Sequence, residues 1–181
     1  MEGPVVTAFD MLAGSYLRDN LAAGFPARFH FRVELWSIGG LFGLSHDLER
    51  SIEYDILVHF IALEKTYAVS LAEKDRVPFS LGKFTGVEDA ERAVARPIPV
   101  PITAPKSKRL MYYQVTLEAA NIQISDLDDL NRWLRGELGP AISGNRNPGT
   151  ALSRGLKSIV AKLLGGSARE YVTTSPNFRA P

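Results

Sequence analysis

The chain has 181 residues, of which 45% are hydrophobic and 23% are charged, as in an ordinary globular protein. This length suits one domain with an appendage, and such a domain buries roughly 70% of its unfolded surface. The net charge of +1 excludes a strong overall field that would attract nucleic acid. The absence of cysteine excludes disulfides, thiol catalysis and Cys-ligated metal sites.

The first residues, MEGPVVTAFD, do not form a basic region followed by an apolar one, so we expect no signal peptide from them. No apolar run reaches the roughly 20 residues that span a bilayer. The start as printed therefore predicts a protein made in the cytoplasm.

The N-terminal part is predicted to contain a strand, a helix and a second strand. Residues 5–10 favour a short strand. Residues 11–25 place Leu12, Tyr16, Leu17 and Leu21 at helical spacing. Residues 27–37 alternate as in a half-buried antiparallel strand, with Phe29, Phe31, Val33 and Leu35 on one face and Arg28, His30, Arg32 and Glu34 on the other.

Three more strands are predicted to follow. Residues 48–63 alternate over a long stretch and should pair back on residues 27–37 as a hairpin. Residues 65–72 and 77–86 each favour a shorter strand. The short connections between these segments predict a meander.

A helix and a last long strand come next. Residues 86–97 carry acidic residues early and arginines late, as the helix dipole favours. The proline-rich run 97–102 lacks a backbone donor at every second residue, so it is predicted to be an edge strand or a polyproline segment. Residues 107–124 form the last long strand, which carries apolar groups on both faces and is expected at a central position.

The C-terminal part is predicted to form two helices joined by a linker. Ser125 caps a helix over 125–138, whose apolar stripe is Leu127, Leu130, Trp133 or Leu134, and Leu138. Residues 139–150 form a linker rich in Gly, Pro and Asn, and residues 151–166 a basic amphipathic helix. Residues 167–181 show no periodicity and are predicted to be an irregular tail.

These elements together predict an α+β fold. Its sheet is mainly antiparallel and meander-like, with five to six strands, and helices cover one face or edge. The sheet-rich domain spans residues 1–138, and the C-terminal amphipathic helix is attached to it through the linker.

No pattern in the chain indicates catalysis or metal binding. The three histidines, His30, His46 and His59, do not have metal-ligand spacing. His30 and His59 lie on strands predicted to pair, so they could approach each other, and Glu53 and Asp55 share one strand face. A solvated polar sheet face is the favoured interpretation of both pairs. We therefore predict no catalytic residue, no cofactor and no metal.

One feature with a functional interpretation is the basic helix. Residues 146–169 contain five basic residues and no acidic one. A basic amphipathic helix packs on its own domain, fills a partner's groove or lies on an anionic membrane, and all three alternatives stay open. The segment lacks aromatic residues for base stacking, so no nucleic-acid partner is predicted. The predicted partner-binding residues here are Leu156, Ile159, Leu163, Arg154, Lys157 and Lys162.

A second such feature is the connection WSIGGLFGLSHD, Trp36 to Asp47, which places large apolar residues among three glycines. Glycine permits a sharp turn, but turning does not require Leu41 and Phe42. These side chains either fold back over the end of the sheet or form an exposed anchor. Ser45 and Asp47 are expected to act as turn or cap residues. The predicted partner-binding set in this turn is Trp36, Ile38, Leu41, Phe42 and Leu44.

A succession of segments resembles an uncharacterised bacterial family. They fall within roughly residues 10–138 and are YLRDNLAAGFP, FRVELW, IEYDILV, TYAVSL, EDAERAVA with the proline run, YYQVTLEA and ISDLDDLNRWL. The family consists of small exported sheet-rich proteins, domain of unknown function 4390, whose members usually begin with a signal peptide and an additional strand pair, both absent here. The resemblance implies an envelope-facing β-rich module without known activity.

The expected function is that of a non-catalytic interaction module. It would be an accessory or structural subunit that docks on other protein subunits of a larger membrane-associated assembly. We expect peripheral attachment to a membrane, in the periplasm if the resemblance holds and in the cytoplasm if the printed start is the native one. The alternatives are a carrier of lipid or small apolar ligands in the cell envelope and a hydrolase with an unrecognised site.

Overall fold

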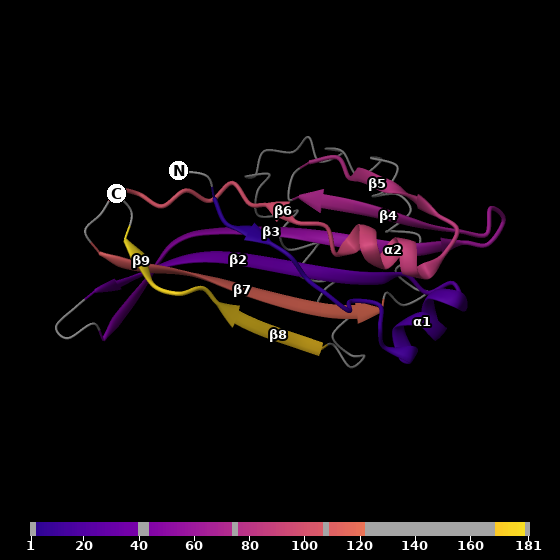
Figure 1. Ribbon diagram of the computed structural model, residues 1–181, viewed down its shortest axis with the longest axis horizontal. Coiled ribbons are helices and arrows are strands. Elements are labelled where there is room, and N and C mark those ends of the chain that lie inside the picture. The colour runs from indigo at the N-terminus through magenta and orange to yellow at the C-terminus, as the bar shows by residue number, and fades with distance from the viewer. Residues whose placement is uncertain (1–2, 40–43, 74–75, 107–108, 122–168, 180–181) are drawn as a thin grey trace, which may run out of the picture.

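The computed structural model describes residues 3–39, 44–73, 76–106, 109–121 and 169–179 and consists mainly of antiparallel strands (Figure 1). The predicted linker 139–150 and the two helices predicted after residue 124 lie outside the described residues. Within them the α+β class is confirmed, with one large sheet, one small sheet and two helices.

The first four strands of the large sheet form the predicted meander. They are β2 (Ala27–Gly39), β3 (Ser45–Ile61), β4 (Thr66–Glu73) and β5 (Phe79–Phe84), each antiparallel to the next. The β3 strand is much longer than β4, which pairs only with its second half, Tyr54–Ile61. The β2–β3 hairpin therefore extends past the rest of the meander, and we call this end of the sheet distal.

The last long strand, β7 (Leu110–Asn121), pairs with the other side of β2, so its predicted central position is confirmed. Two more strands then pair with β7, namely β8 (Arg169–Thr174) and β9 (Phe178–Arg179). The large sheet thus has seven strands rather than the predicted five to six.

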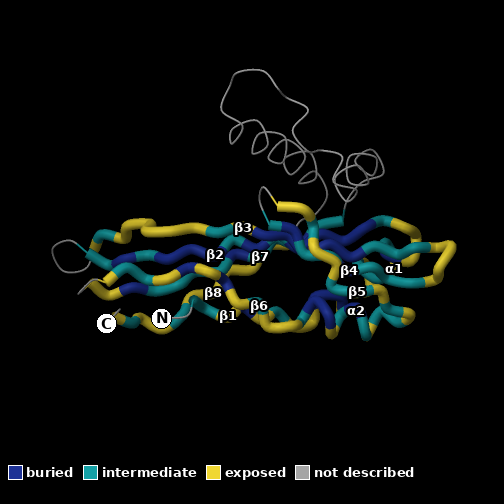
Figure 2. The backbone as a smooth tube through the Cα atoms, turned by 90° about the horizontal axis from the view of Figure 1, so that it is seen from above, coloured by how far each residue is buried: buried dark blue, intermediate teal, exposed yellow. Residues whose placement is uncertain are grey.

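Short elements cover one face of the sheet, as Figure 2 shows from above. They are β1 (Val5–Val6) paired with β6 (Ile98–Pro99), and the helices α1 (Ser15–Ala22) and α2 (Val87–Val94). The proline-rich run therefore supplies an edge strand. The helix expected from residue 11 begins only at Ser15, because Gly14 before it has an extended backbone.

The two helices are joined through Arg18 and Glu91. The Arg18 guanidinium lies 3.1 Å from the Glu91 carboxylate and donates a 2.6 Å hydrogen bond to the Leu12 carbonyl. The Leu12 amide in turn donates to Glu91 at 3.3 Å. This arrangement buries Leu12 completely, although it precedes the helix.

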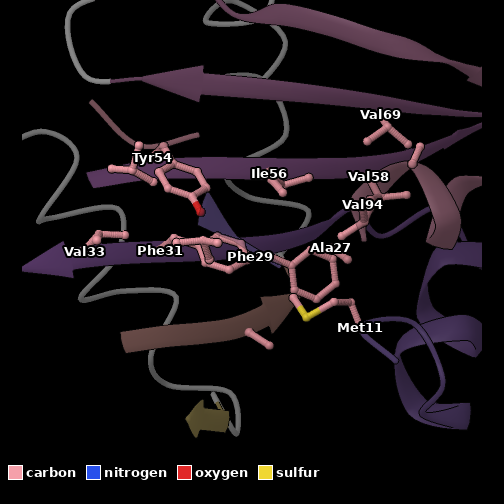
Figure 3. Close-up of a cluster of buried hydrophobic side chains, with 14 of the residues drawn as sticks. Met11, Ala27, Phe29, Phe31, Val33, Tyr54, Ile56, Val58, Val69 and Val94 are labelled. Carbon is pink, nitrogen blue, oxygen red and sulfur yellow. The ribbon is translucent and has the colours of Figure 1, made fainter. Parts of the chain in front are cut away.

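The core lies between the sheet and these elements. Four apolar residues of β2 share the predicted face and are all buried: Phe29, Phe31, Val33 and Leu35. They meet Tyr54, Ile56 and Val58 of β3, and the rings of Phe31 and Tyr54 stack with centroids 4.8 Å apart (Figure 3). Burial raises the pKa of the Tyr54 hydroxyl, which has no hydrogen-bond partner among the described residues. We call this side of the sheet the core face.

The prediction of an irregular tail over 167–181 is wrong for the described residues 169–179. The Ser175 amide donates to the Tyr113 carbonyl at 2.8 Å, and the Tyr113 amide donates to the Ser175 hydroxyl at 2.9 Å. Phe178 stacks on Tyr113 with ring centroids 5.1 Å apart. The apolar residues of β8, Tyr171 and Val172, are adjacent and do not alternate, and β9 has only two residues, so only their partner β7 reveals these strands.

We expect Phe178→Ala to lower the free energy of unfolding by roughly 2 kcal/mol, because it removes a half-buried ring and its stacking on Tyr113. The control is Phe9→Ala, at a side chain that is 75% exposed, which should change stability by less than about 0.5 kcal/mol. Urea denaturation measures both. Equal effects would contradict the docked position of the tail.

Candidate functional site

The side of the sheet opposite the core face carries a row of charged residues. We call it the charged face; on β2 it consists of Arg28, His30, Arg32 and Glu34. The sequence predicts a solvated polar face here, and this is wrong for Arg28, Glu34 and Asp55 of β3, which are only 9%, 8% and 7% exposed. The central position of β2 between β3 and β7 contributes to this burial, because side chains of both neighbours flank each of its residues.

The most buried part of this row is an ion pair between Arg28 and Asp55. The Arg28 Nε and Nη2 atoms donate to the two carboxylate oxygens at 2.9 and 3.0 Å. His30 Nδ1 lies 2.9 Å from Asp55 Oδ1. The Arg28 Nη2 atom also lies 3.3 Å from His30 Nδ1, so this nitrogen faces both a hydrogen-bond acceptor and a hydrogen-bond donor.

Further along β2 the contacts become longer and more exposed. Arg32 reaches Glu118 of β7 at 3.4 Å and Glu53 of β3 at 3.9 Å. Glu34 accepts hydrogen bonds from Gln114 at 3.4 Å and from the Trp36 indole at 3.3 Å. These residues therefore bind one another across three strands.

His59 lies on the charged face of β3, nearer the β3–β4 turn. Burial, reinforced by the nearby Lys83 charge, lowers the pKa of its imidazole below the usual 6.5. Lys83 also binds Glu64 at 2.7 Å and thereby lowers the pKa of that carboxyl.

The fold does not bring together the side chains on which the hydrolase alternative relies. His30 lies opposite Asp55, which places His59 about 13 Å further along β3. Glu53 and Asp55 share a face as predicted but bind different arginines. Among the described residues, no group of three or more His, Asp or Glu side chains could hold a metal ion.

The distal end of the charged face is apolar and aromatic. Trp36 lies between Leu48 of β3 and Tyr112 of β7, and Ile38 lies beside Leu110 of β7. We call these five residues the distal patch. Leu48 is 50% exposed and Leu110 37%. The Tyr112 hydroxyl is held 2.9 Å from His46 Nδ1. Arg109 lies 3.5 Å from Asp47, which pairs with Ser37 and therefore belongs to the other face of the hairpin.

The predicted turn from Trp36 to Asp47 is shorter than expected. Trp36 and Ile38 are strand residues of β2, and Ser45 and Asp47 belong to β3, because the two strands stay paired as far as Gly39 and Ser45. Leu44 precedes β3 and is 83% exposed, as the anchor interpretation requires. Leu41 and Phe42 lie outside the described residues, as do Leu156, Ile159, Leu163, Arg154, Lys157 and Lys162.

Sequence reasoning missed Leu48, Leu110 and Tyr112. The alternation of β3 places Leu48 on the core face with Ile52 and Tyr54. A β-bulge between Leu35 and Trp36 adds one residue on the β3 side, so Leu48 faces Trp36 instead. No local signal marks this bulge.

No family model, no curated protein and no solved structure matches the chain. The resemblance described above therefore stays a prediction, as do the carrier and hydrolase alternatives. Neither of the described helices is long and apolar enough to cross a bilayer.

Asp55→Asn should lower the free energy of unfolding by about 3 kcal/mol, because it leaves the Arg28 charge buried without a carboxylate. The matched variant is Glu53→Gln on the same strand face, where the side chain is 44% exposed and lies 3.9 Å from Arg32. It should cost less than about 0.5 kcal/mol. Denaturant titration of both variants checks this, and a similar loss in the two would contradict it.

The lowered pKa of His59 predicts a pH-dependent stability. The unfolded chain takes up a proton near pH 6.5, whereas the folded chain does so only at lower pH, so stability falls as the pH drops below about 6.5. His59→Gln cannot be protonated, and its unfolding free energy should fall less than that of the wild type between about pH 7.5 and 5.5. Identical pH profiles from thermal or denaturant unfolding would refute this.

Proposed function

We propose that the protein is a non-catalytic interaction module, an accessory subunit that docks on other subunits of a larger membrane-associated assembly. The observation that carries this proposal is the distal patch. It gathers side chains of three strands on the face away from the core. Within it Leu48 is 50% exposed, and Leu44, which precedes β3, is 83% exposed.

The composition of the distal patch supports a protein partner. Trp, Tyr and large aliphatic residues dominate the energetically important centres of protein interfaces. The polar ends of Trp36 and Tyr112 are already hydrogen-bonded to Glu34 and His46. Their rings can therefore be covered by a partner without leaving these donors unsatisfied.

The surroundings of the patch have the polar rim that such a centre needs. Glu34 and Gln114, which are hydrogen-bonded to each other, border it on the side of Arg32, and His46, opposite Ile38, borders it toward the end of the hairpin. Beyond β4, the outer edge of β3 has no partner strand among the described residues. Charged side chains along this edge oppose direct pairing with another strand, which favours contact through the face of the sheet.

The membrane association rests on the sequence. The basic helix predicted over 151–166 supplies a second contact, to a partner or to an anionic surface. The proposed location is peripheral to a membrane, on the periplasmic side if the family resemblance holds and on the cytoplasmic side otherwise.

Leu48→Asp should reduce co-purification of the partner at least about tenfold, because it introduces a charge into the distal patch beside Trp36. The assay is recovery of the tagged protein from detergent-solubilised membranes of its own cells, with the complex sized and its members identified. The matched control is Leu63→Asp, at a residue that is 96% exposed at the β3–β4 turn.

Both variants should keep the wild-type melting temperature, since both side chains are outside the core. Recovery of the wild-type protein alone, as a monomer, would overturn the proposal. An equal loss of the partner with Leu63→Asp would overturn the assignment to the distal patch.

A further inference from the structure

The charged face has a second, separate buried region. Leu57 and Ala72 lie there on β3 and β4, and each is only 3% exposed. Neither belongs to the core cluster on the other side of the sheet. Asp55 and Arg28, which flank them, are 7% and 9% exposed. A sheet face open to water would leave these side chains accessible, so this region is covered.

The cover does not come from the described elements. The residues of α1, α2, β1 and β6 that are buried pack into the core cluster, and Figure 2 shows β1, β6 and α2 together on one side of the sheet. The cover also ends before the distal patch, where Leu48 is half-exposed.

Polar atoms on the same face are sealed from water as well. Arg32 Nε, His59 Nδ1 and Ser70 Oγ are inaccessible to solvent and have no hydrogen bond within the described structure. All three residues lie on the charged face, since Arg32 is paired with Glu53, and Ser70 with Leu57. An unpaired buried polar group costs about 1–3 kcal/mol, so the covering segment is expected to bring hydrogen-bonding groups as well as apolar ones.

The course of the chain identifies a candidate for the cover. The β7 strand ends at Asn121, which lies beside Ala27, and β8 begins with Arg169 beside Ala119. The intervening residues 122–168 therefore leave and rejoin the sheet at the end where Arg28 and Leu57 lie. The helix predicted over 125–138 begins only a few residues after β7.

We propose that the segment 125–138 forms a helix that packs across the charged face over β7, β2, β3 and β4. Its stripe of Leu127, Leu130, Leu134 and Leu138 would cover Leu57 and Ala72, and an amphipathic helix requires such a surface for its apolar side. A helix of this length measures about 21 Å. Four adjacent strands span about 15 Å, so the lengths match.

The absence of cysteine in the chain makes thiol protection a clean test. Ser70→Cys places a nearly isosteric thiol on the charged face of β4. Val69→Cys places one on the core face of the same strand, where Val69 is 1% exposed. Ser80→Cys, at an exposed residue opposite Ser70, provides the rate of an open thiol. Each full-length variant is treated with a maleimide under native conditions.

The thiols of the Ser70→Cys and Val69→Cys variants should both react at least about 100-fold more slowly than the exposed reference, as expected for thiols reached only through local opening. Adding Leu130→Asp should raise the rate of the Ser70→Cys variant at least about tenfold and leave the Val69→Cys variant protected. Gly136→Asp, on the opposite side of the predicted helix, should leave both protected.

Two results would overturn the proposal. One is a Ser70→Cys thiol that reacts as fast as the exposed reference in the otherwise unchanged chain. The other is a Ser70→Cys thiol that stays protected with Leu130→Asp. Protection of Val69→Cys in the Leu130→Asp background shows that the domain has not unfolded. Loss of that protection as well would be a third result against the proposal, because the helix would then belong to the core and not to a separate cover.

Discussion

Strand β2 is hydrogen-bonded to β3 on one side and to β7 on the other, and its register with these two neighbours places almost every other element. The pairing directs Phe29 and Phe31 into the core and Arg28 and Arg32 to the other face. A shift of one residue would exchange the two faces, which would bury arginines in the core and expose phenylalanines. The fold therefore depends on this alignment.

The charged face shows what the central position of β2 requires. Arg28 and Asp55 come from different strands and are both nearly buried, so neither charge is tolerated without the other. Such a pair adds little net stability compared with an apolar pair, but it penalises any other alignment of β2 with β3. His30 Nδ1 lies 2.9 Å from the same carboxylate. The row thus reinforces the register that the apolar alternation favours.

The distal patch follows from the unequal lengths of the strands. Because β4 pairs only with the second half of β3, the first half of β3 extends with β2 and β7 beyond the other strands of the meander. The bulge opposite Trp36 then turns Leu48 toward the exposed face. Among the described residues this is where apolar side chains from three strands meet outside the core, and it borders the connection in which the sequence places Leu41 and Phe42.

The sequence by itself determined the elements whose periodicity is local: the alternation of residues 27–37 and 48–63, the helix before Pro97 and the edge role of the proline run. A side chain's direction along one strand depends only on its neighbours in sequence, so the core residues of β2 could be named in advance. The burial of Arg28, the bulge that turns Leu48, and the docking of β8 and β9 depend on which strands lie side by side. Those pairings are set by contacts between residues far apart in the chain, and only the tertiary structure decided them.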